Sequence, residues 1–317
     1  MGRIIEIDGL GKQYGTLTAL NNLSLSVEEG AVVGFIGPNG AGKTTTMRIL
    51  TTLLQPTAGQ AWVGGYSVAE QPREVRKVIG YMPDFFGVYE DMKTWEYLDF
   101  FAACYDVPTN DRQGLMNDLL SLVDLGHKKD EYVENLSRGM KQRLCLARTL
   151  AHDPQVLILD EPASGLDPRA RIEMRELLRE LKNMGKTIFF SSHILSEVAD
   201  ICTNIAILEA GKLVAFGDMA MMKKQLHTHR IIHVRILNNM ESFQELLLVD
   251  PRVIAVLASE EEKIQQGLVS FEFAGDDQTL SELLTDFIQA GIQIVSFHQE
   301  DGDLEDVFLK VTRGIIN

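Results

Sequence analysis

A glycine-rich segment near the start of the chain, residues 37–44, has the residue types needed to bind phosphate. It fits the pattern G-x-x-x-x-G-K-[ST], in which the backbone curls until successive N–H groups face one anion. Lys43 is expected to reach the β- and γ-phosphates of a nucleotide and act in catalysis, and the Thr44 hydroxyl to hold Mg²⁺. The expected nucleotide contacts are Gly37, Pro38, Asn39, Gly40, Ala41, Gly42, Lys43, Thr44 and Thr45. A chance glycine-rich turn is the alternative, but a strand-like run precedes the segment and a helix-like run follows it, as phosphate binding requires.

Two acidic residues end an apolar run at residues 156–161. Such a run delivers a carboxylate to the edge of a sheet, so Asp160 is predicted to bind Mg²⁺ beside the phosphate loop. Glu161 follows directly and is predicted to accept a proton from the attacking water as a general base. An isolated acidic strand end is more often simply solvated, but the phosphate loop favours the chemical interpretation. The two segments together predict nucleotide hydrolysis with Mg²⁺ as the metal.

A parallel sheet is needed to position these segments, and the first two-thirds of the chain has the pattern of one. Short apolar runs alternate with amphipathic segments, which is typical of an α/β fold with helices packed on a sheet. The predicted strands are 31–37, 156–160, 187–191 and 204–209. Residues 85–152 interrupt the alternation with helix-like segments and no strong strand, so a helical subdomain is expected there.

The chain after residue 218 has a different pattern. A basic, Met-rich stretch from Met219 to Lys224 resembles a helix leading out of the first domain, and residues 219–229 are predicted to link domain 1–218 to a small accessory domain at 230–317. That domain has the order strand, helix, strand, strand, helix, strand, which is typical of a ferredoxin-like α+β fold. The predicted elements are strands 230–237, 252–258, 268–273 and 293–298, helices 241–248 and 280–290, and a final helix from Asp303.

The composition of the 317 residues excludes several classes of protein. The apolar fraction of 45% and charged fraction of 24% are those of a folded globular chain. No apolar run approaches the roughly 18–20 residues that cross a bilayer, and the amino terminus lacks a secretory signal, so a cytosolic location is expected. Three scattered cysteines do not form a disulfide framework. A net charge of −15 disfavours nucleic acid as a partner.

A serine–glycine motif at residues 136–143 narrows the function. The run Leu-Ser-Arg-Gly-Met-Lys-Gln-Arg opens a helix-like segment and resembles the signature motif of ABC-family ATPases. The resemblance implies that Ser137 and Gly139 bind the γ-phosphate of an ATP held by a second copy of the chain, so that two ATPs lie between two chains. Arg138 and Met140 stand where the family usually has glycine and glutamine.

Further matches follow in the order of the ABC family, over residues 3–217. Residues 164–167 resemble the D-loop, with Asp167 near the nucleotide; His193 is similar to the switch histidine, and Tyr14 to the aromatic that stacks on adenine. Alone, a histidine after a strand is usually structural and a tyrosine is usually core. Together the matches imply the α/β fold of a P-loop NTPase, an ABC ATPase domain with an inserted helical subdomain, and ATP as the nucleotide.

One position departs from the ABC pattern. After residues 79–83 the family has a glutamine that contacts Mg²⁺ and the membrane subunit, but this chain has Asp84. Asp84 is predicted to join the metal shell, and the alternative is a solvated loop acid. The aromatic residues that follow either line a groove for a membrane partner or pack in a core, and the two interpretations are equally favoured. They are Phe85, Phe86, Tyr89, Trp95, Tyr97, Phe100 and Phe101.

The predicted function is therefore that of an ATP-hydrolysing subunit of an ABC transporter, dimerising around two Mg-ATP to drive a separate integral-membrane permease at the cytoplasmic face of the cell membrane. Residues 304–309 resemble the ending of ABC-2-type exporter subunits, which favours export, although the same residues suit an amphipathic helix packed on the small domain. The alternatives are an importer subunit, or a soluble ABC ATPase acting on a non-transport machine.

Overall fold

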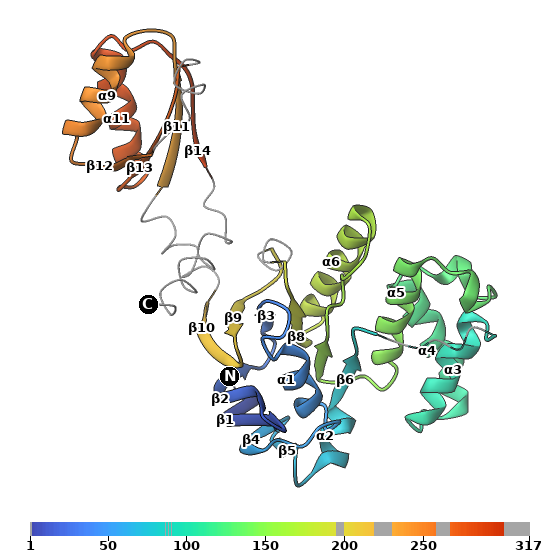
Figure 1. Ribbon diagram of the computed structural model, residues 1–317. Coiled ribbons are helices and arrows are strands. Elements are labelled where there is room, and N and C mark those ends of the chain that lie inside the picture. Colours follow the sequence, from blue (N-terminus) through green and yellow to red (C-terminus); the bar gives the residue numbers. More distant parts are fainter. Residues whose placement is uncertain are drawn as a thin grey trace. The chain divides into compact units, whose positions relative to one another are not determined.

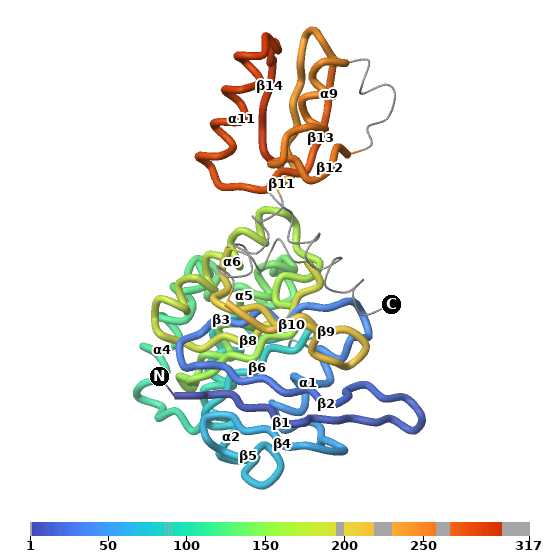
Figure 2. Tube along the Cα trace, turned by 90° about the vertical axis from the view of Figure 1, so that its left-hand side faces the viewer, coloured from blue at the N-terminus to red at the C-terminus, as the bar shows by residue number. Residues whose placement is uncertain are grey.

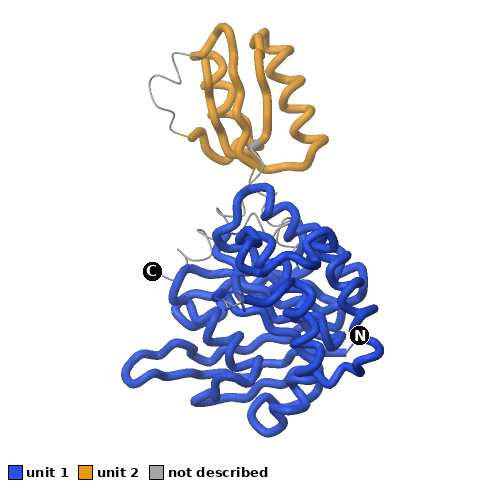
Figure 3. The backbone as a smooth tube through the Cα atoms, turned by 90° about the vertical axis from the view of Figure 1, so that its right-hand side faces the viewer, with its two compact units in different colours: residues 1–219 blue, residues 220–317 orange. Residues whose placement is uncertain are grey.

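The computed structural model describes residues 2–85, 87, 89, 91–194, 200–218, 230–257 and 267–300. The chain forms two compact units, Met1–Met219 and Ala220–Asn317 (Figures 1 and 3). The predicted linker at 219–229 and the predicted final helix from Asp303 lie outside the described residues. Within those residues, no helix has the length and apolar character that crossing a membrane demands.

A six-stranded sheet forms the centre of the first unit, in the order β10-β9-β3-β8-β7-β6. Five neighbouring strands are parallel, and the edge strand β10 runs antiparallel to β9. The inner strands of this sheet, β3, β7 and β8, are buried on both faces, which explains the apolar runs found there in the sequence. The strands are β3 (Val32–Ile36), β6 (Ile79–Met82), β7 (Val156–Leu159), β8 (Thr187–Ser192), β9 (Asn204–Glu209) and β10 (Lys212–Asp218).

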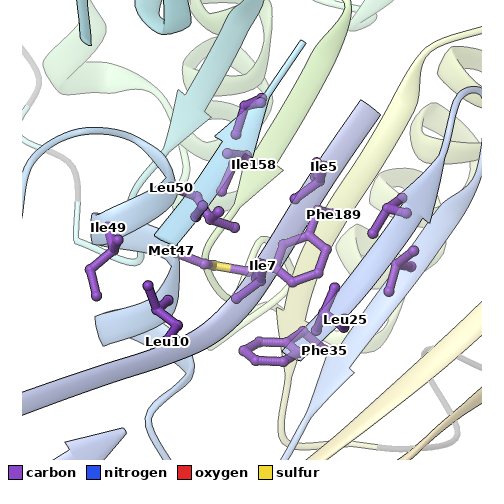
Figure 4. Close-up of a cluster of buried hydrophobic side chains, with 14 of the residues drawn as sticks. Ile5, Ile7, Leu10, Leu25, Phe35, Met47, Ile49, Leu50, Ile158 and Phe189 are labelled. Atoms are coloured by element: carbon purple, nitrogen blue, oxygen red, sulfur yellow. The ribbon is translucent and has the colours of Figure 1, made fainter. Parts of the chain in front are cut away.

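A second, antiparallel sheet of order β2-β1-β4-β5 packs against the first, and the sequence analysis did not predict it. Helix α1 (Lys43–Leu50) contributes Met47 and Leu50 to the core between the sheets, where they meet side chains of β1 and β8 (Figure 4). This core fixes α1, and with it the end of the glycine-rich segment. The remaining elements here are β1 (Arg3–Tyr14), β2 (Leu17–Glu28), β4 (Ala58–Val63), β5 (Tyr66–Ser67) and α2 (Pro72–Val78).

The predicted helical insertion is present between β6 and β7. It consists of α3 (Thr94–Cys104), α4 (Thr109–Leu122), the short helices η1 (Gly126–Lys128) and η2 (Val133–Asn135), and α5 (Arg138–Thr149). The side chain of Ser137 caps α5 by accepting a hydrogen bond from the Met140 N–H at 3.3 Å. Such a cap satisfies one of the unpaired donors at the start of the helix, so α5 begins directly after the serine.

The aromatic residues of this insertion include both buried and exposed side chains. Tyr97 is fully buried and its hydroxyl accepts a hydrogen bond from Arg148 of α5 at 3.1 Å, so it belongs to the core. Phe85 and Tyr89 are exposed at 91% and 52%, and Phe100, which packs edge to face on Tyr89 at 5.4 Å, is also exposed. Phe86 lies outside the described residues. A groove for a membrane partner stays a prediction for the exposed members of the set.

The second unit is a four-stranded antiparallel sheet of order β12-β13-β11-β14, with two helices on one face (Figure 2). Phe243 and Phe287 of the helices pack edge to face at 5.0 Å in its core. Each strand and helix predicted between 230 and 298 is found; strand 268–273 has the predicted ends, and the ends of the others are shifted. The elements are β11 (Arg230–Ile236), α9 (Met240–Val249), β12 (Val253–Leu257), β13 (Leu268–Phe273), α11 (Asp277–Gln289) and β14 (Ile294–Glu300).

Candidate active site

Four neighbouring parallel strands deliver the candidate site residues to one edge of the sheet. Strand β3 ends at the glycine-rich loop, β7 ends at Asp160 and Glu161, β8 ends before His193, and β6 ends before Asp84. Ligands of open α/β sheets bind at this edge, outside the carboxyl ends of the strands. The strand order therefore brings together residues that are far apart in the sequence.

The glycine-rich loop depends on two glycines that no other residue can replace. A Cβ atom on Gly37 would lie 2.3 Å from the carbonyl oxygen of Leu208. Gly42 has a φ of +107°, and a Cβ there would lie 2.7 Å from the carbonyl oxygen of Ala19. The loop can therefore pack this tightly against β2 and β9 while its N–H groups and the start of α1 face one site.

Lys43 is buried beneath this loop, with 6% of its surface exposed. Its ammonium group donates to the carbonyl oxygens of Gly37 at 2.6 Å and Pro38 at 3.4 Å, and lies 3.4 Å from Oε1 of Glu161. A buried ammonium needs such partners, because an isolated buried charge is strongly disfavoured. The charge of Lys43 is thereby fixed between the phosphate loop and the end of β7.

Asp160 and Glu161 share one serine. The Ser191 hydroxyl of β8 donates to Oδ1 of Asp160 at 2.7 Å and accepts from the backbone N–H of Glu161 at 2.8 Å. Sequence reasoning did not identify Ser191, although its place at the end of a predicted strand, two residues before His193, was the available signal. Oδ2 of Asp160, which is 1% exposed, has no hydrogen-bond partner among the described residues. A buried carboxylate with one unpaired oxygen is suited to a cation.

The side chain of Glu161 is held by two charged or polar neighbours. Oε2 lies 2.8 Å from Nδ1 of His193, and Oε1 faces the ammonium group of Lys43. Glu161 also has a φ of +51°, a backbone conformation that non-glycine residues rarely adopt and that is frequent at functional sites. The carboxylate therefore points into the site at the cost of local backbone strain.

The side chains of Lys43, Glu161 and His193 line one cleft of about 460 Å³, whereas Gly37 and Asp160 are not among its lining residues. It contains most of the residues predicted from the sequence: Tyr14, Pro38, Asn39, Gly40, Ala41, Gly42, Lys43, Thr44, Thr45, Asp84, Glu161 and His193. Leu17, Ala19 and Ser164 also line it and were not predicted. The Tyr14 ring is half-exposed, and the Lys12 ammonium lies over it, 5.3 Å from the ring centroid.

Asp84 lines this cleft together with Glu161, whereas Asp160, at the end of β7, is not among the residues that line it. Burial, followed by the charges of Asp160 and Glu161, raises the pKa of Asp84 above its ordinary value, and the charges of Arg138 and His193 partly oppose this. A cation close to Asp84 would favour its ionised form.

The signature residues do not line this cleft. Ser137, Gly139 and Asp167 line a separate cavity of about 570 Å³ at the start of α5 and of α6 (Pro168–Asn183). Asp167 caps α6 by accepting from the Ala170 N–H at 2.9 Å. Within one chain, therefore, the phosphate loop and the signature form two distinct surfaces, each with a helix N-terminus.

Comparisons with known proteins identify the family of the chain. The profile of the ABC transporter family matches residues 20–164. The chain is 33% identical to the bacitracin transport ATP-binding protein BcrA of Bacillus licheniformis, over 99% of this chain and 99% of that protein. It is 34% identical to the Nod factor export ATP-binding protein I of Ralstonia nicotianae, over 98% of this chain and 94% of that protein.

A solved ATP-binding subunit of an ABC transporter superimposes with a TM-score of 0.64 at 29% identity, over 71% of this chain and 93% of that one. The family predicted from the signature and the phosphate loop is confirmed, as is its α/β fold with an inserted helical subdomain. The chain belongs to the ATP-binding proteins of ABC transporters, and is an ATPase of that family.

Proposed function

We propose that this ATPase drives export through a separate integral-membrane permease, at the cytoplasmic face of the cell membrane. The observation that carries the proposal is the full-length similarity, second unit included, to proteins named for bacitracin transport and Nod factor export. Linearmycin resistance protein LnrL of Bacillus subtilis is also similar, at 28% identity over 98% of this chain. The net charge of −15 supports the absence of nucleic acid from its partners.

The test of this proposal is purification of the chain from its own membranes in mild detergent. A polytopic membrane protein is expected to copurify in a fixed ratio, and substrate efflux from inside-out vesicles holding both proteins is expected to require ATP. Accumulation in the opposite direction would indicate an importer. Copurification with ribosomes or another soluble machine, and no membrane protein, would contradict transport altogether.

Glu161 is proposed as the general base, because its carboxylate lines the cleft and is oriented by both Lys43 and His193. A base must lie within hydrogen-bond reach of the proton it takes, and the fixed carboxylate satisfies that requirement at the end of β7. His193 holds Oε2 of Glu161 and is proposed to contact the γ-phosphate with its other ring nitrogen. Tyr14 is proposed to stack on the adenine.

The residues present fit a magnesium ion. Thr44 and Asp160 are proposed to hold it, with Asp84 joining directly or through water; the unpaired buried oxygen of Asp160 and the raised pKa of Asp84 support this set. Oxygen ligands of this kind are those that Mg²⁺ prefers. When bound, Mg²⁺ neutralises charge on the β- and γ-phosphate oxygens. Lys43 and the loop N–H groups are proposed to bind the same phosphates.

A second copy of the chain is proposed to complete each site. The phosphate loop and the signature line separate cavities within one chain, and each presents a helix N-terminus suited to phosphate. Two identical copies related by a two-fold axis can place the Ser137–Gly139 surface of one against the phosphate loop of the other. Asp167, beside the same surface, is proposed to lie near the nucleotide in that dimer.

The second unit is proposed to be a ferredoxin-like domain. Its element order, β11-α9-β12-β13-α11-β14, and its strand order, β12-β13-β11-β14, support that assignment, as does the antiparallel pairing of every neighbouring pair. The proposed boundaries are 1–218 for the ABC ATPase domain, with its helical subdomain at about 85–152, a linker at 219–229, and 230–317 for the small domain.

Replacing Lys43 with alanine is expected to weaken ATP binding by about 10- to 100-fold, since a hydrogen bond to a charged group contributes about 1.5–3 kcal/mol. The ammonium group is fixed by two loop carbonyls, and Lys43 is the one lysine or arginine among the described residues that line the cleft. Titration calorimetry with ATP measures the change. Lys77→Ala, which removes an exposed lysine paired with Glu74, is the control and should bind as the wild type does. Unchanged affinity of the Lys43 variant would remove the lysine from the phosphate site.

Replacing Asp84 with alanine is expected to raise the Mg²⁺ concentration for half-maximal ATPase activity by up to about 30-fold. A unit negative charge and a divalent cation about 4 Å apart in a water-like medium attract each other by about 2 kcal/mol, which is the basis of that figure. Asp84→Gln, which supplies the neutral oxygen usual at this position in the family, should lie between. The measurement is a Mg²⁺ titration of the ATPase rate for each protein. Asp118→Ala, which removes an exposed acid of α4, is the control, and superimposable curves would leave Asp84 as a solvated loop acid.

A further inference from the structure

The turn that follows β7 is held by the signature helix of the same chain. The carbonyl oxygen of Ser164 accepts a hydrogen bond from Nε2 of Gln142 and another from Nη2 of Arg138, each at 3.3 Å. A carbonyl oxygen has two lone pairs, so both donors can be accommodated at once. Arg138 and Gln142 are four residues apart on α5, which places both on the same face of the helix.

The same turn fixes the backbone of Glu161. The N–H of Ser164 donates to the carbonyl oxygen of Glu161 at 3.0 Å, while the N–H of Glu161 donates to Ser191 at 2.8 Å. Glu161 therefore keeps its positive φ between two hydrogen bonds, one of which comes from a residue that α5 holds in place. A disfavoured backbone conformation persists only where its surroundings impose it.

Gly165 allows the arginine to lie directly against this turn. A Cβ atom on Gly165 would lie 2.4 Å from Nη2 of Arg138, and the φ of +67° at this position also favours glycine. Any other residue at 165 would displace the guanidinium group from the Ser164 carbonyl. The contact of Arg138 with the turn thus depends on a glycine within the turn itself.

The side chain of Gln142 is not the one that would stabilise the fold best at this position. It is buried, with 2% of its surface exposed, and its Oε1 has no hydrogen-bond partner among the described residues. A buried polar atom without a partner destabilises a fold, and an apolar side chain of similar length would avoid that cost. The presence of an amide is therefore better explained by the hydrogen bond that its Nε2 donates to the Ser164 carbonyl oxygen.

We propose that Gln142 and Arg138 are positioning residues for ATP hydrolysis, which hold the Ser164 carbonyl and thereby orient the Glu161 carboxylate. The proposal rests on the proposed role of Glu161 as the general base. Neither residue lines the nucleotide cleft, whereas Ser164 and Glu161 both do. The two side chains therefore act on turnover through the turn, without contacting the nucleotide held by their own chain.

The first experiment replaces Gln142 with methionine and Arg138 with alanine, singly and together. Each single variant is expected to lower kcat about 10-fold, the effect of losing one hydrogen bond that orients a reacting group, while KM for ATP stays within about twofold. The melting temperature of Gln142→Met should be unchanged or higher, because the unpaired Oε1 is removed as well. A purely structural role would instead lower the melting temperature and kcat together, and that result would overturn the proposal.

Arg179→Ala is the matched control for charge. Arg179 lies on α6, is 42% exposed and pairs with Glu176, and it lines neither the nucleotide cleft nor the cavity at the start of α5. Its removal takes away one positive charge and is expected to leave kcat at the wild-type value. A loss equal to that of Arg138→Ala would assign the effect to the loss of a positive charge and overturn the positioning role of the arginine.

A second readout tests whether the two residues act through Glu161. In a Glu161→Gln background, Gln142→Met is expected to lower the residual rate by less than twofold, because there is no base left to orient. A further 10-fold loss in that background would overturn the proposal. If Glu161→Gln is slow but the single variant Gln142→Met turns over like the wild type, the base is retained and only the positioning role is rejected. Wild-type turnover of Glu161→Gln itself would reject the base first, and the positioning role with it.

Discussion

Turnover of the Glu161→Gln variant is expected to fall by about 10²–10⁴-fold, while ATP still binds. Glutamine has the length and shape of glutamate and can remain between Lys43 and His193, but it cannot accept a proton from water. The nucleotide should therefore stay bound and uncleaved, and an ATP-dependent dimer should accumulate. Phosphate release measures the rate, calorimetry measures the affinity, and size-exclusion chromatography with and without ATP detects the dimer.

Glu176→Gln is the matched control for this experiment. Glu176 lies on α6, is 61% exposed and pairs with Arg179, so the same change of chemistry there should leave the rate untouched. Wild-type turnover of the Glu161 variant would contradict its role as the base. Loss of ATP binding would have a different meaning, namely that the Glu161 carboxylate is needed to hold Lys43 in place beneath the loop.

The parallel strands were predictable because burial on both faces leaves a strong signal in the sequence. Strands β7 and β8 are buried along their whole length, and all of β7 and the middle of β8, residues 188–190, are apolar runs that the sequence shows directly. The antiparallel sheet was missed for the opposite reason. Strands β1 and β2 alternate between buried and exposed residues and contain register shifts, which weakens the period-2 pattern.

Strand β6 was not predicted, because it is short and contains Gly80. Glycine is required there by a contact with a distant part of the chain. A Cβ atom on Gly80 would lie 2.5 Å from the carbonyl oxygen of Thr149, at the end of α5. Glycine in a short run usually lowers the expectation of a strand, but here it marks a close approach of backbone from the inserted helical subdomain. Only the assembled fold reveals that neighbour.

Some residues of the site were also predictable from the local sequence, and others were not. The phosphate loop and the acidic end of β7 carry their chemistry within a few residues of sequence, so spacing alone identified them. Ser191 acts on residues 30 and 31 positions away, through a contact that exists only because β7 and β8 are neighbours in the sheet. The Ser164 carbonyl has no sequence signal, because every residue has a backbone carbonyl and its two hydrogen-bond donors, Arg138 and Gln142, lie on a helix more than 20 residues earlier in the chain.

Mixing two inactive chains is expected to restore hydrolysis if each site is built from two copies. Ser137→Arg damages the signature but leaves Glu161 intact, and Glu161→Gln damages the base but leaves the signature intact. In a mixed dimer, one site combines the intact loop and base of the first chain with the intact signature of the second. Random pairing makes about half of the dimers mixed, each with one working site of two, so the mixture should recover about a quarter of wild-type activity per chain if the sites act independently.

A second mixture is the control for this experiment, because two substitutions that damage the same surface cannot restore hydrolysis in a mixed dimer. Lys43→Ala and Glu161→Gln both damage the phosphate-loop surface, so in a mixed dimer each site carries one of the two lesions and none is complete. That mixture should stay inactive at every ratio, whereas the Ser137→Arg mixture should rise to a maximum at equal amounts and fall on either side. If the Ser137 mixture gave no more than the sum of its two components, each chain would have to hydrolyse ATP alone. The cavity at the start of α5 would then need a ligand other than the nucleotide of a second copy.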